Sequence, residues 1–285
     1  MESIELGYKI EKMIDMINDI YINELKQYKN YFNKEGEKEL AKDCLETYLR
    51  AYEMIKNNNY VDGVSIARSS FEALLTLIGI HISEECREAY FRANRYEIYQ
   101  ERKRKEKYAE DYMSQKYLRK IIKKRCKNVR DDLDEFYQVL SQYIHPTIYR
   151  NNLTNNGEQD KELYFTILNF ILTIPTIAIL ILCDLKIIRE EQATDSLNLK
   201  ALSENVSCRN KREINNLQLK IYEDVNKDYY EKLKKQQEND INKLKAELAK
   251  YKCEIENAHK ITMRKTEYQA VYEIAQEILN EMNVK

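Results

Sequence analysis

Glycine and proline are scarce in this sequence. Five glycines and two prolines are spread over 285 residues, and tryptophan is absent. Hairpins and sandwiches of β-strands depend on turns rich in these residues, so their scarcity disfavours β architectures. The composition therefore predicts an all-α fold, and a chain of this length can bury a sizeable hydrophobic core.

The sequence also lacks an excess of charge of either sign. Its 47 basic residues face 48 acidic ones, which gives a formal net charge of -1. No global attraction to nucleic acid or membrane is expected, so any such attraction must be local. The six cysteines are more than twenty positions apart, which excludes CxxC zinc or redox pairs. Charged residues interrupt the N-terminal apolar positions, so we expect no signal peptide and a cytoplasmic protein with free thiols.

Hydrophobic periodicity predicts two amphipathic helices near the N-terminus. The apolar residues of 3–32 recur with a period close to 3.5, which is typical of a long helix with one buried face. A second helix is predicted over 40–55 and should stop at 57–59, where three asparagines compete for helical hydrogen bonds. Asp62 is then expected to cap the helix that follows.

The stretch 63–80 is the predicted central helix. Apolar residues occupy one helical face for about five turns, and the only two charges are Arg68 and Glu72. These two lie four positions apart on one face, close enough to pair. Because an ion pair is costly to bury unless its groups are satisfied, the pair indicates either a structural network or a functional site.

A strongly basic segment follows. Residues 101–130 hold thirteen basic and four acidic side chains, with tyrosines interleaved. Cations can bind phosphates and aromatic rings can stack on unpaired bases, so we interpret the segment as an RNA-binding surface, with a merely solvated helix face as the alternative. Over 116–140 one continuous helix is predicted, with basic and apolar residues on separate faces. The candidate RNA-binding residues are Arg102, Arg104, Lys116, Arg119, Lys120, Lys123, Lys127 and Arg130.

The same helix is expected to end at His145. Pro146 disfavours a helical conformation for the residue before it, which places His145 at the helix terminus. The chain has three histidines, and this one follows the basic face along the chain. It is a candidate general base, although a structural role is the common one for a single histidine.

Residues 163–183 contain no charge and are long enough to cross a bilayer. Asn169 and Pro175 near the centre, and flanks without a positive bias, favour the core helix of a bundle. A membrane span remains the alternative. We therefore predict a helical bundle over 1–189 in which this segment is internal.

The C-terminal part is highly charged. We predict a linker or short helices over 190–212 and a coiled-coil or helical-hairpin tail over 213–285. Apolar residues step by four over 217–233 and alternate three and four positions apart over 241–258, the spacing of a coiled-coil seam. Such a tail cannot bury its seam alone. It should pack back on the bundle or on a second chain, so a homodimer is expected.

Two short motifs carry a family resemblance. Arg-Ser-x-x-Glu at 68–72 and Ser-x-Tyr-x-His-Pro at 141–146 resemble one branch of the HEPN-type helical domains, with the resemblance covering about 40–185. Such domains are helical bundles, often dimeric, found in RNA-cutting toxins, defence effectors and non-catalytic RNA-binding partners. The resemblance implies that Arg68, Glu72 and His145 meet in one site.

The sequence departs from the main HEPN nuclease pattern because no histidine follows an arginine by four to six residues. Three functions therefore stay open. The first is an effector of a defence or toxin system that binds RNA, with or without cleaving it. Cleavage of this kind needs no metal or cofactor. His145 would activate the ribose 2′-hydroxyl, Arg68 would bind the phosphate, and Glu72 would orient one or both of these side chains. The second is a non-enzymatic module for oligomerisation or binding a partner protein. The third is a membrane effector anchored by 163–183.

Overall fold

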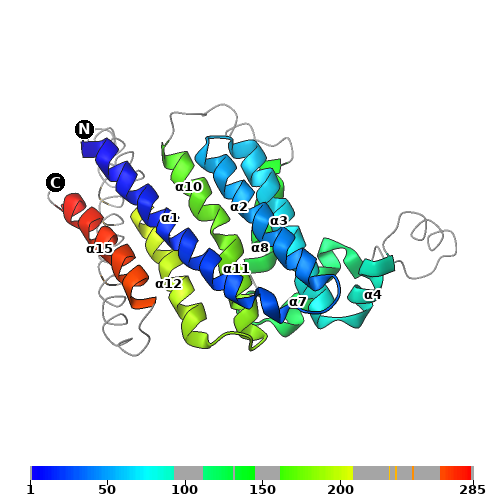
Figure 1. Cartoon of the computed structure of the whole chain (residues 1–285). Helices are drawn as coiled ribbons and strands as arrows, with labels where there is room; N and C mark the ends of the chain where they lie inside the picture. The colour runs from blue at the N-terminus through cyan, green and yellow to red at the C-terminus, as the bar shows by residue number, and fades with distance from the viewer. Residues whose placement is uncertain are drawn as a thin grey trace. The chain divides into compact units, whose positions relative to one another are not determined.

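The computed structural model describes residues 2–92, 112–130, 132–144, 161–207 and 264–283, together with the single positions 231, 235 and 246. Within these residues every secondary-structure element is a helix and no strand occurs (Figure 1). The all-α fold class predicted from the sequence is confirmed.

The chain divides into two compact units. The first comprises residues 1–21, 160–170 and 195–285, and the second comprises residues 22–159 and 171–194. The first unit holds most of α1 (Glu2–Tyr28), α10 (Lys161–Ile171), most of α12 (Glu190–Ser207) and α15 (Arg264–Asn283). The second holds η1 (Lys29–Tyr31), α2 (Glu37–Lys56), α3 (Tyr60–Ile82), α4 (Glu84–Arg92), α7 (Gln115–Arg125), α8 (Asp132–Ile144) and α11 (Thr173–Asp184).

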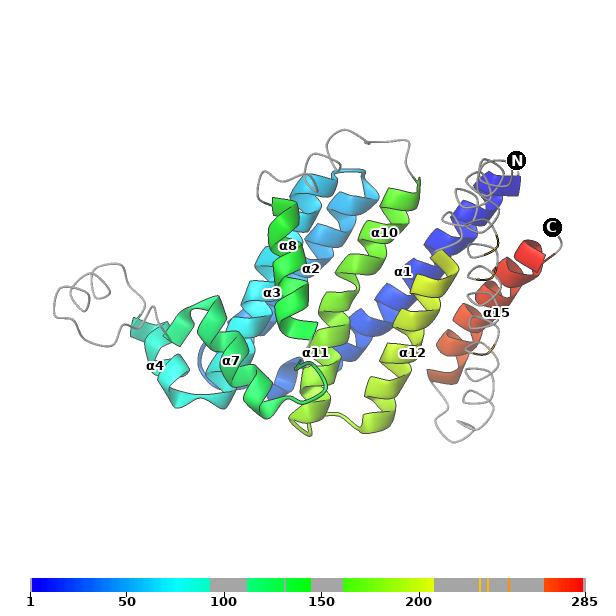
Figure 2. The same ribbon diagram turned by 180° about the vertical axis from the view of Figure 1, so that it is seen from behind.

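Helix α3 is the centre of the second unit, and it runs beside α2 in both views (Figures 1 and 2). The apolar face predicted for 63–80 is confirmed, because all of its members are buried. They are Val64, Ala67, Phe71, Leu74, Leu75 and Ile78.

Two glycines let neighbouring helices approach α3 closely. A Cβ atom on Gly63 would lie 2.5 Å from Cγ1 of Ile55 on α2. A Cβ atom on Gly79 would lie 2.4 Å from Cδ2 of Leu118 on α7. No real Cβ is found at such distances, so these positions fix where α2 and α7 contact α3.

The connection between α2 and α3 follows the sequence prediction except at its cap. Helix α2 ends at Lys56, and the amide of Asn57 donates to the Glu53 carbonyl at 2.8 Å. Helix α3 is flanked by Asn59 at its N-cap, so the prediction that Asp62 caps it is wrong. Asp62 lies in the first turn and accepts a hydrogen bond from Asn59 at 2.9 Å.

The single helix predicted over 116–140 is wrong. Helix α7 ends at Arg125, Cys126 is extended, and α8 begins at Asp132. The backbone N–H of Asn128 in the turn donates to Asp184 at 2.9 Å, which satisfies a group that a continuous helix would have bonded internally. The predicted apolar positions are nevertheless buried on both sides of the break: Leu118, Ile122, Cys126, Val129, Leu133, Phe136 and Leu140.

The uncharged segment forms α10 and α11, with a turn at Leu172 between them. Pro175 lies in the first turn of α11, where its missing N–H breaks no helical bond. Among the described residues, two helical stretches are long and apolar enough to cross a membrane: α3 (Tyr60–Ile82) and Leu163–Asp184, which spans α10 and α11. Of their most apolar windows, 61% and 83% are buried inside the protein. Burial of this kind is typical of core helices, which pass the same test.

The first unit shows where part of the C-terminal tail packs. Helix α15 buries Tyr268, Val271, Ala275 and Ile278, and its Glu277 pairs with Lys9 of α1 at 3.3 Å. This stretch therefore packs back within the chain. The expected linker begins with an 18-residue helix, α12, in which Leu199 and Leu202 are buried. The coiled-coil seam predicted over 241–258 lies outside the described residues apart from the single position 246.

We predict that Gly79→Ala lowers the free energy of unfolding by about 1–3 kcal/mol, because the added methyl group must displace Leu118. Urea unfolding followed by circular dichroism measures the change. Ser69→Ala, at an exposed position of the same helix, should change stability by less than about 0.5 kcal/mol. Equal stability of the two variants would contradict the close approach of α7.

Candidate functional site

The predicted pair on α3 is formed and is joined by a tyrosine from α8. Arg68 Nε donates to Glu72 Oε1 at 2.8 Å. Arg68 Nη2 donates to the Tyr137 hydroxyl at 3.0 Å, and that hydroxyl donates to Glu72 Oε1 at 3.2 Å. The three groups thus form a closed network that ties α3 to α8.

The network is partly open to water. The side chains of Arg68 and Glu72 are 22% and 32% exposed. Partial burial lowers the pKa of Arg68, but the hydrogen bonds and charge of Glu72, with the bond to Tyr137, outweigh it and raise the pKa. The pair is therefore a fixed cation and carboxylate that solvent can reach.

Helix α7 adds a second guanidinium to this site. Arg119 Cζ lies 3.9 Å from the centroid of the Tyr137 ring, and Arg68 Cζ lies 5.2 Å from the same centroid. Arg119 Nε also donates to Asp134 at 2.7 Å, and Lys123 pairs with the other oxygen of Asp134. Hydrogen bonds from Lys123 and Arg119 hold the pKa of Asp134 below its ordinary value.

The predicted RNA-binding residues are divided by this arrangement. Arg119 and Lys123 are paired with Asp134, whereas Lys116, Lys120, Lys127 and Arg130 are exposed. Two further exposed cations, Lys124 and Arg125, were not singled out from the sequence, although α7 carries six basic residues and no acidic one. Arg102, Arg104 and His145 lie outside the described residues.

Two polar atoms on α7 lack a partner among the described residues. They are Oε1 of Gln115 and Nη1 of Arg119, both buried. Because Gln115 and Arg119 lie four positions apart, the free acceptor and the free donor are on the same face of α7. The face of α7 beside Tyr137 therefore keeps unused hydrogen-bonding capacity.

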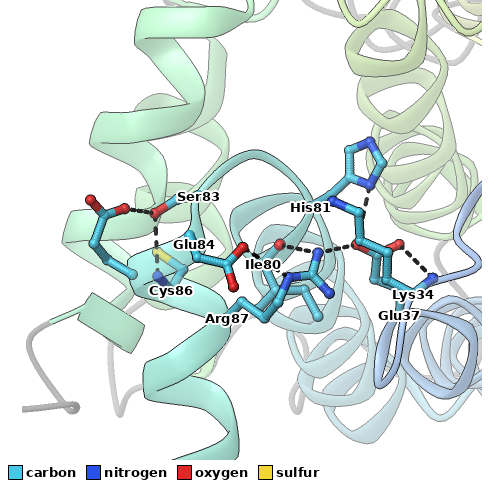
Figure 3. Close-up of polar contacts among 9 residues, drawn as sticks. Lys34, Glu37, Ile80, His81, Ser83, Glu84, Cys86 and Arg87 are labelled. Atoms are coloured by element: carbon cyan, nitrogen blue, oxygen red, sulfur yellow. Dashed lines mark hydrogen bonds and ion pairs between the residues drawn. The ribbon is translucent and has the colours of Figure 1, made fainter.

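A second cluster, around Glu37, was not predicted (Figure 3). Glu37 has no exposed side-chain surface, and its Oε1 accepts from Arg87 Nη2 at 2.6 Å. His81 Nδ1 lies 3.3 Å from the same oxygen, and the Lys34 backbone N–H donates to Oε2 at 3.3 Å. Arg87 also donates to the Ile80 carbonyl at 2.8 Å, so the buried carboxylate is held from α3 and α4.

The sequence offered no signal for this second cluster. His81 and Arg87 lie 44 and 50 positions after Glu37 in the sequence. The three residues belong to three successive helices, α2, α3 and α4. Read alone, each residue looks like an ordinary polar residue of a helix. Only the antiparallel packing of α2 on α3 and the turn into α4 bring them together.

Thiolate and metal chemistry find little support in the described residues. Burial raises the pKa of Cys44 and of Cys126 to about 12, so both thiols stay protonated at neutral pH. The four described cysteines are free. In the described part of the chain, no group of three or more His, Cys, Asp or Glu side chains is placed to hold a metal ion.

Comparison with protein-family models, with curated proteins and with solved structures finds no match for this chain.

We predict that Tyr137→Phe lowers the free energy of unfolding by about 0.5–1.5 kcal/mol, because Arg68 and Glu72 lose the hydroxyl that links them while the ring under Arg119 remains. Chemical denaturation measures the change. Tyr8→Phe, at an exposed position of α1, is the control and should be neutral to within about 0.5 kcal/mol. A neutral Tyr137→Phe would mean that the network contributes nothing to stability.

Asp134→Asn should change how stability depends on pH. Because the folded-state pKa of Asp134 is depressed, its stabilising contribution is present above the unfolded value near 3.8 and is lost as the pH falls through the folded value. The difference in unfolding free energy between wild type and Asp134→Asn should therefore be largest near neutral pH and vanish in strong acid. Glu135→Gln, an exposed neighbour, is the control. A difference that grew on acidification would refute the assignment.

Proposed function

We propose that this chain is an RNA-binding protein of the HEPN-like type, and that α7 with the turn after it forms the surface that contacts the strand. The observation that carries the proposal is the charge of this surface. Helix α7 has six basic residues and no acidic one, and six cations along α7 and the turn are exposed: Lys116, Lys120, Lys124, Arg125, Lys127 and Arg130.

The pairing around Asp134 supports this proposal. Asp134 binds Arg119 and Lys123, the two cations on the inner side of α7, and so it is already engaged within the protein. The remaining cations face solvent, where a phosphate backbone can displace their counterions. The rings of Tyr112 and Tyr117 meet edge to face at 5.2 Å at the start of α7, and aromatic rings of this kind can stack on unpaired bases.

RNA cleavage is the finer proposal, and the resemblance to defence and toxin effectors motivates it. The partly exposed Arg68 would stabilise charge on the phosphate, and Glu72 would orient Arg68 through the bond at 2.8 Å. His145 would remove the proton of the 2′-hydroxyl. The motif that carries His145 follows α8, the helix whose Tyr137 contacts the pair.

A second candidate is a non-enzymatic interaction module, which fits a homodimer or a complex with a partner protein. One observation favours it: Arg68, Glu72 and Tyr137 satisfy one another within a single chain. A closed polar network is what a structural connection between α3 and α8 requires. In that case replacing His145 would change neither RNA binding nor RNA integrity.

Binding of a fluorescent single-stranded RNA at several salt concentrations tests the first proposal. We expect tight binding that weakens steeply with salt, and a log–log slope that falls by about 0.7 for each phosphate contact removed. The test variant replaces Lys116, Lys120 and Lys124 with Gln. The matched control replaces the same number of cations with Gln, Lys38, Lys42 and Arg50, which are exposed on α2. Equal effects of the two variants, or salt-independent binding, would overturn the assignment to α7.

Cleavage is tested separately on the same RNA. Wild type should release fragments, while His145→Ala and Arg68→Ala should each slow cleavage by at least about 100-fold without loss of RNA binding. A substrate with a 2′-deoxyribose at the cleaved position should resist. Binding without any cleavage would overturn the ribonuclease proposal and would not affect the RNA-binding proposal.

A further inference from the structure

Three exposed lysines of α7 form a straight row. Lys116, Lys120 and Lys124 are all exposed, and each follows the one before it by four positions. Residues at this spacing lie on one side of a helix, and four residues advance along its axis by about 6 Å. The row therefore presents one ammonium group per turn over about 12 Å of α7.

The lysine row is held by a helix whose other side is fixed in the protein. Leu118 and Ile122 follow Lys116 and Lys120 by two positions, which places them on the opposite side of α7, and neither has any exposed surface. Helix α7 itself carries no acidic residue, and the carboxylate of Asp134 is bonded to Arg119 and Lys123. In the part of the chain that the structure describes, the row therefore has no acidic partner and can bind an anion.

The row can bind phosphates but has no group that reads bases. An ammonium group is a point charge, whereas amide and guanidinium groups make the paired hydrogen bonds that identify a base. In α7 such groups belong to Gln115 and Arg119, of which Oε1 and Nη1 are buried, and to Arg125, which ends the helix outside the row. Contacts with phosphates carry no information on the sequence, and they do not involve the 2′-hydroxyl that distinguishes RNA from DNA.

We propose that the row binds a single-stranded polynucleotide through its phosphates, one phosphate to each lysine, and that it binds RNA and DNA of any sequence equally well. This inference rests on the proposed RNA-binding function and specifies its substrate class. A single strand is flexible, so three successive phosphates can follow a straight row, whereas the strands of a duplex wind around its axis. Selection of RNA then belongs to the cleavage step, which requires the 2′-hydroxyl, and not to binding.

Fluorescence anisotropy on the full chain tests the inference with labelled oligonucleotides of about twelve nucleotides. The probes are oligouridine, oligodeoxyuridine, which lacks only the 2′-hydroxyl, and oligocytidine, which differs in its base. We expect the three dissociation constants to agree within about fivefold at each salt concentration. A larger difference would overturn this inference and leave the RNA-binding proposal intact, whereas no binding of any probe would overturn both.

Single variants test the alignment of the strand with α7. Lys116→Gln, Lys120→Gln and Lys124→Gln should each lower the log–log salt slope by about 0.7, for RNA and DNA alike, because each removes one phosphate contact. Lys38→Gln, exposed on α2, is the matched control and should leave the slope unchanged. A lower slope in only one of the three variants would mean that the strand crosses α7, which would overturn the arrangement. Circular dichroism shows whether each variant is folded, and the comparison of RNA with DNA needs only the wild type.

Discussion

The close packing of α3 against its neighbours is the constraint on which the described chemistry depends. Gly63 lets Ile55 of α2 approach at one end of the helix, and Gly79 lets Leu118 of α7 approach at the other. With those contacts fixed, Arg68 and Glu72 face Tyr137 on α8, and His81 faces Glu37 on α2. A larger side chain at either glycine would displace Ile55 or Leu118 from its place in the core, and a close-packed interior accommodates such a change poorly.

The two polar clusters on α3 solve different electrostatic problems. Arg68 and Glu72 keep 22% and 32% of their side-chain surface in water, so the pair is only partly desolvated and solvent still reaches it. Glu37 is fully buried, and a buried carboxylate needs a cation and several donors. Arg87, His81 and a backbone N–H supply them. The first cluster leaves its charges within reach of solvent, and the second is enclosed by the protein.

The sequence predicted local features well and long-range ones poorly. The apolar face of α3 and the pairing of Arg68 with Glu72 follow from helical periodicity alone, and both are formed. The break between α7 and α8 left no signal, because Cys126 and Val129 within the break are buried, as they would be in one helix. Tyr137 and Glu37 owe their roles to helices distant in sequence, and no periodicity encodes such a meeting.

Helix α7 combines a structural contact on one side with the proposed RNA-binding surface on the other. Its inner cations, Arg119 and Lys123, share the single carboxylate of Asp134, and Arg119 stacks on Tyr137, so they fix α7 to α8. The pairing with Asp134 stabilises α7 although all of its charged residues are basic, because the carboxylate offsets part of the repulsion among them. The outer cations then need no partner within the protein for α7 to stay in place. A rigid helix presenting unneutralised cations loses little conformational entropy on meeting a polyanion, and pre-organisation of this kind favours binding.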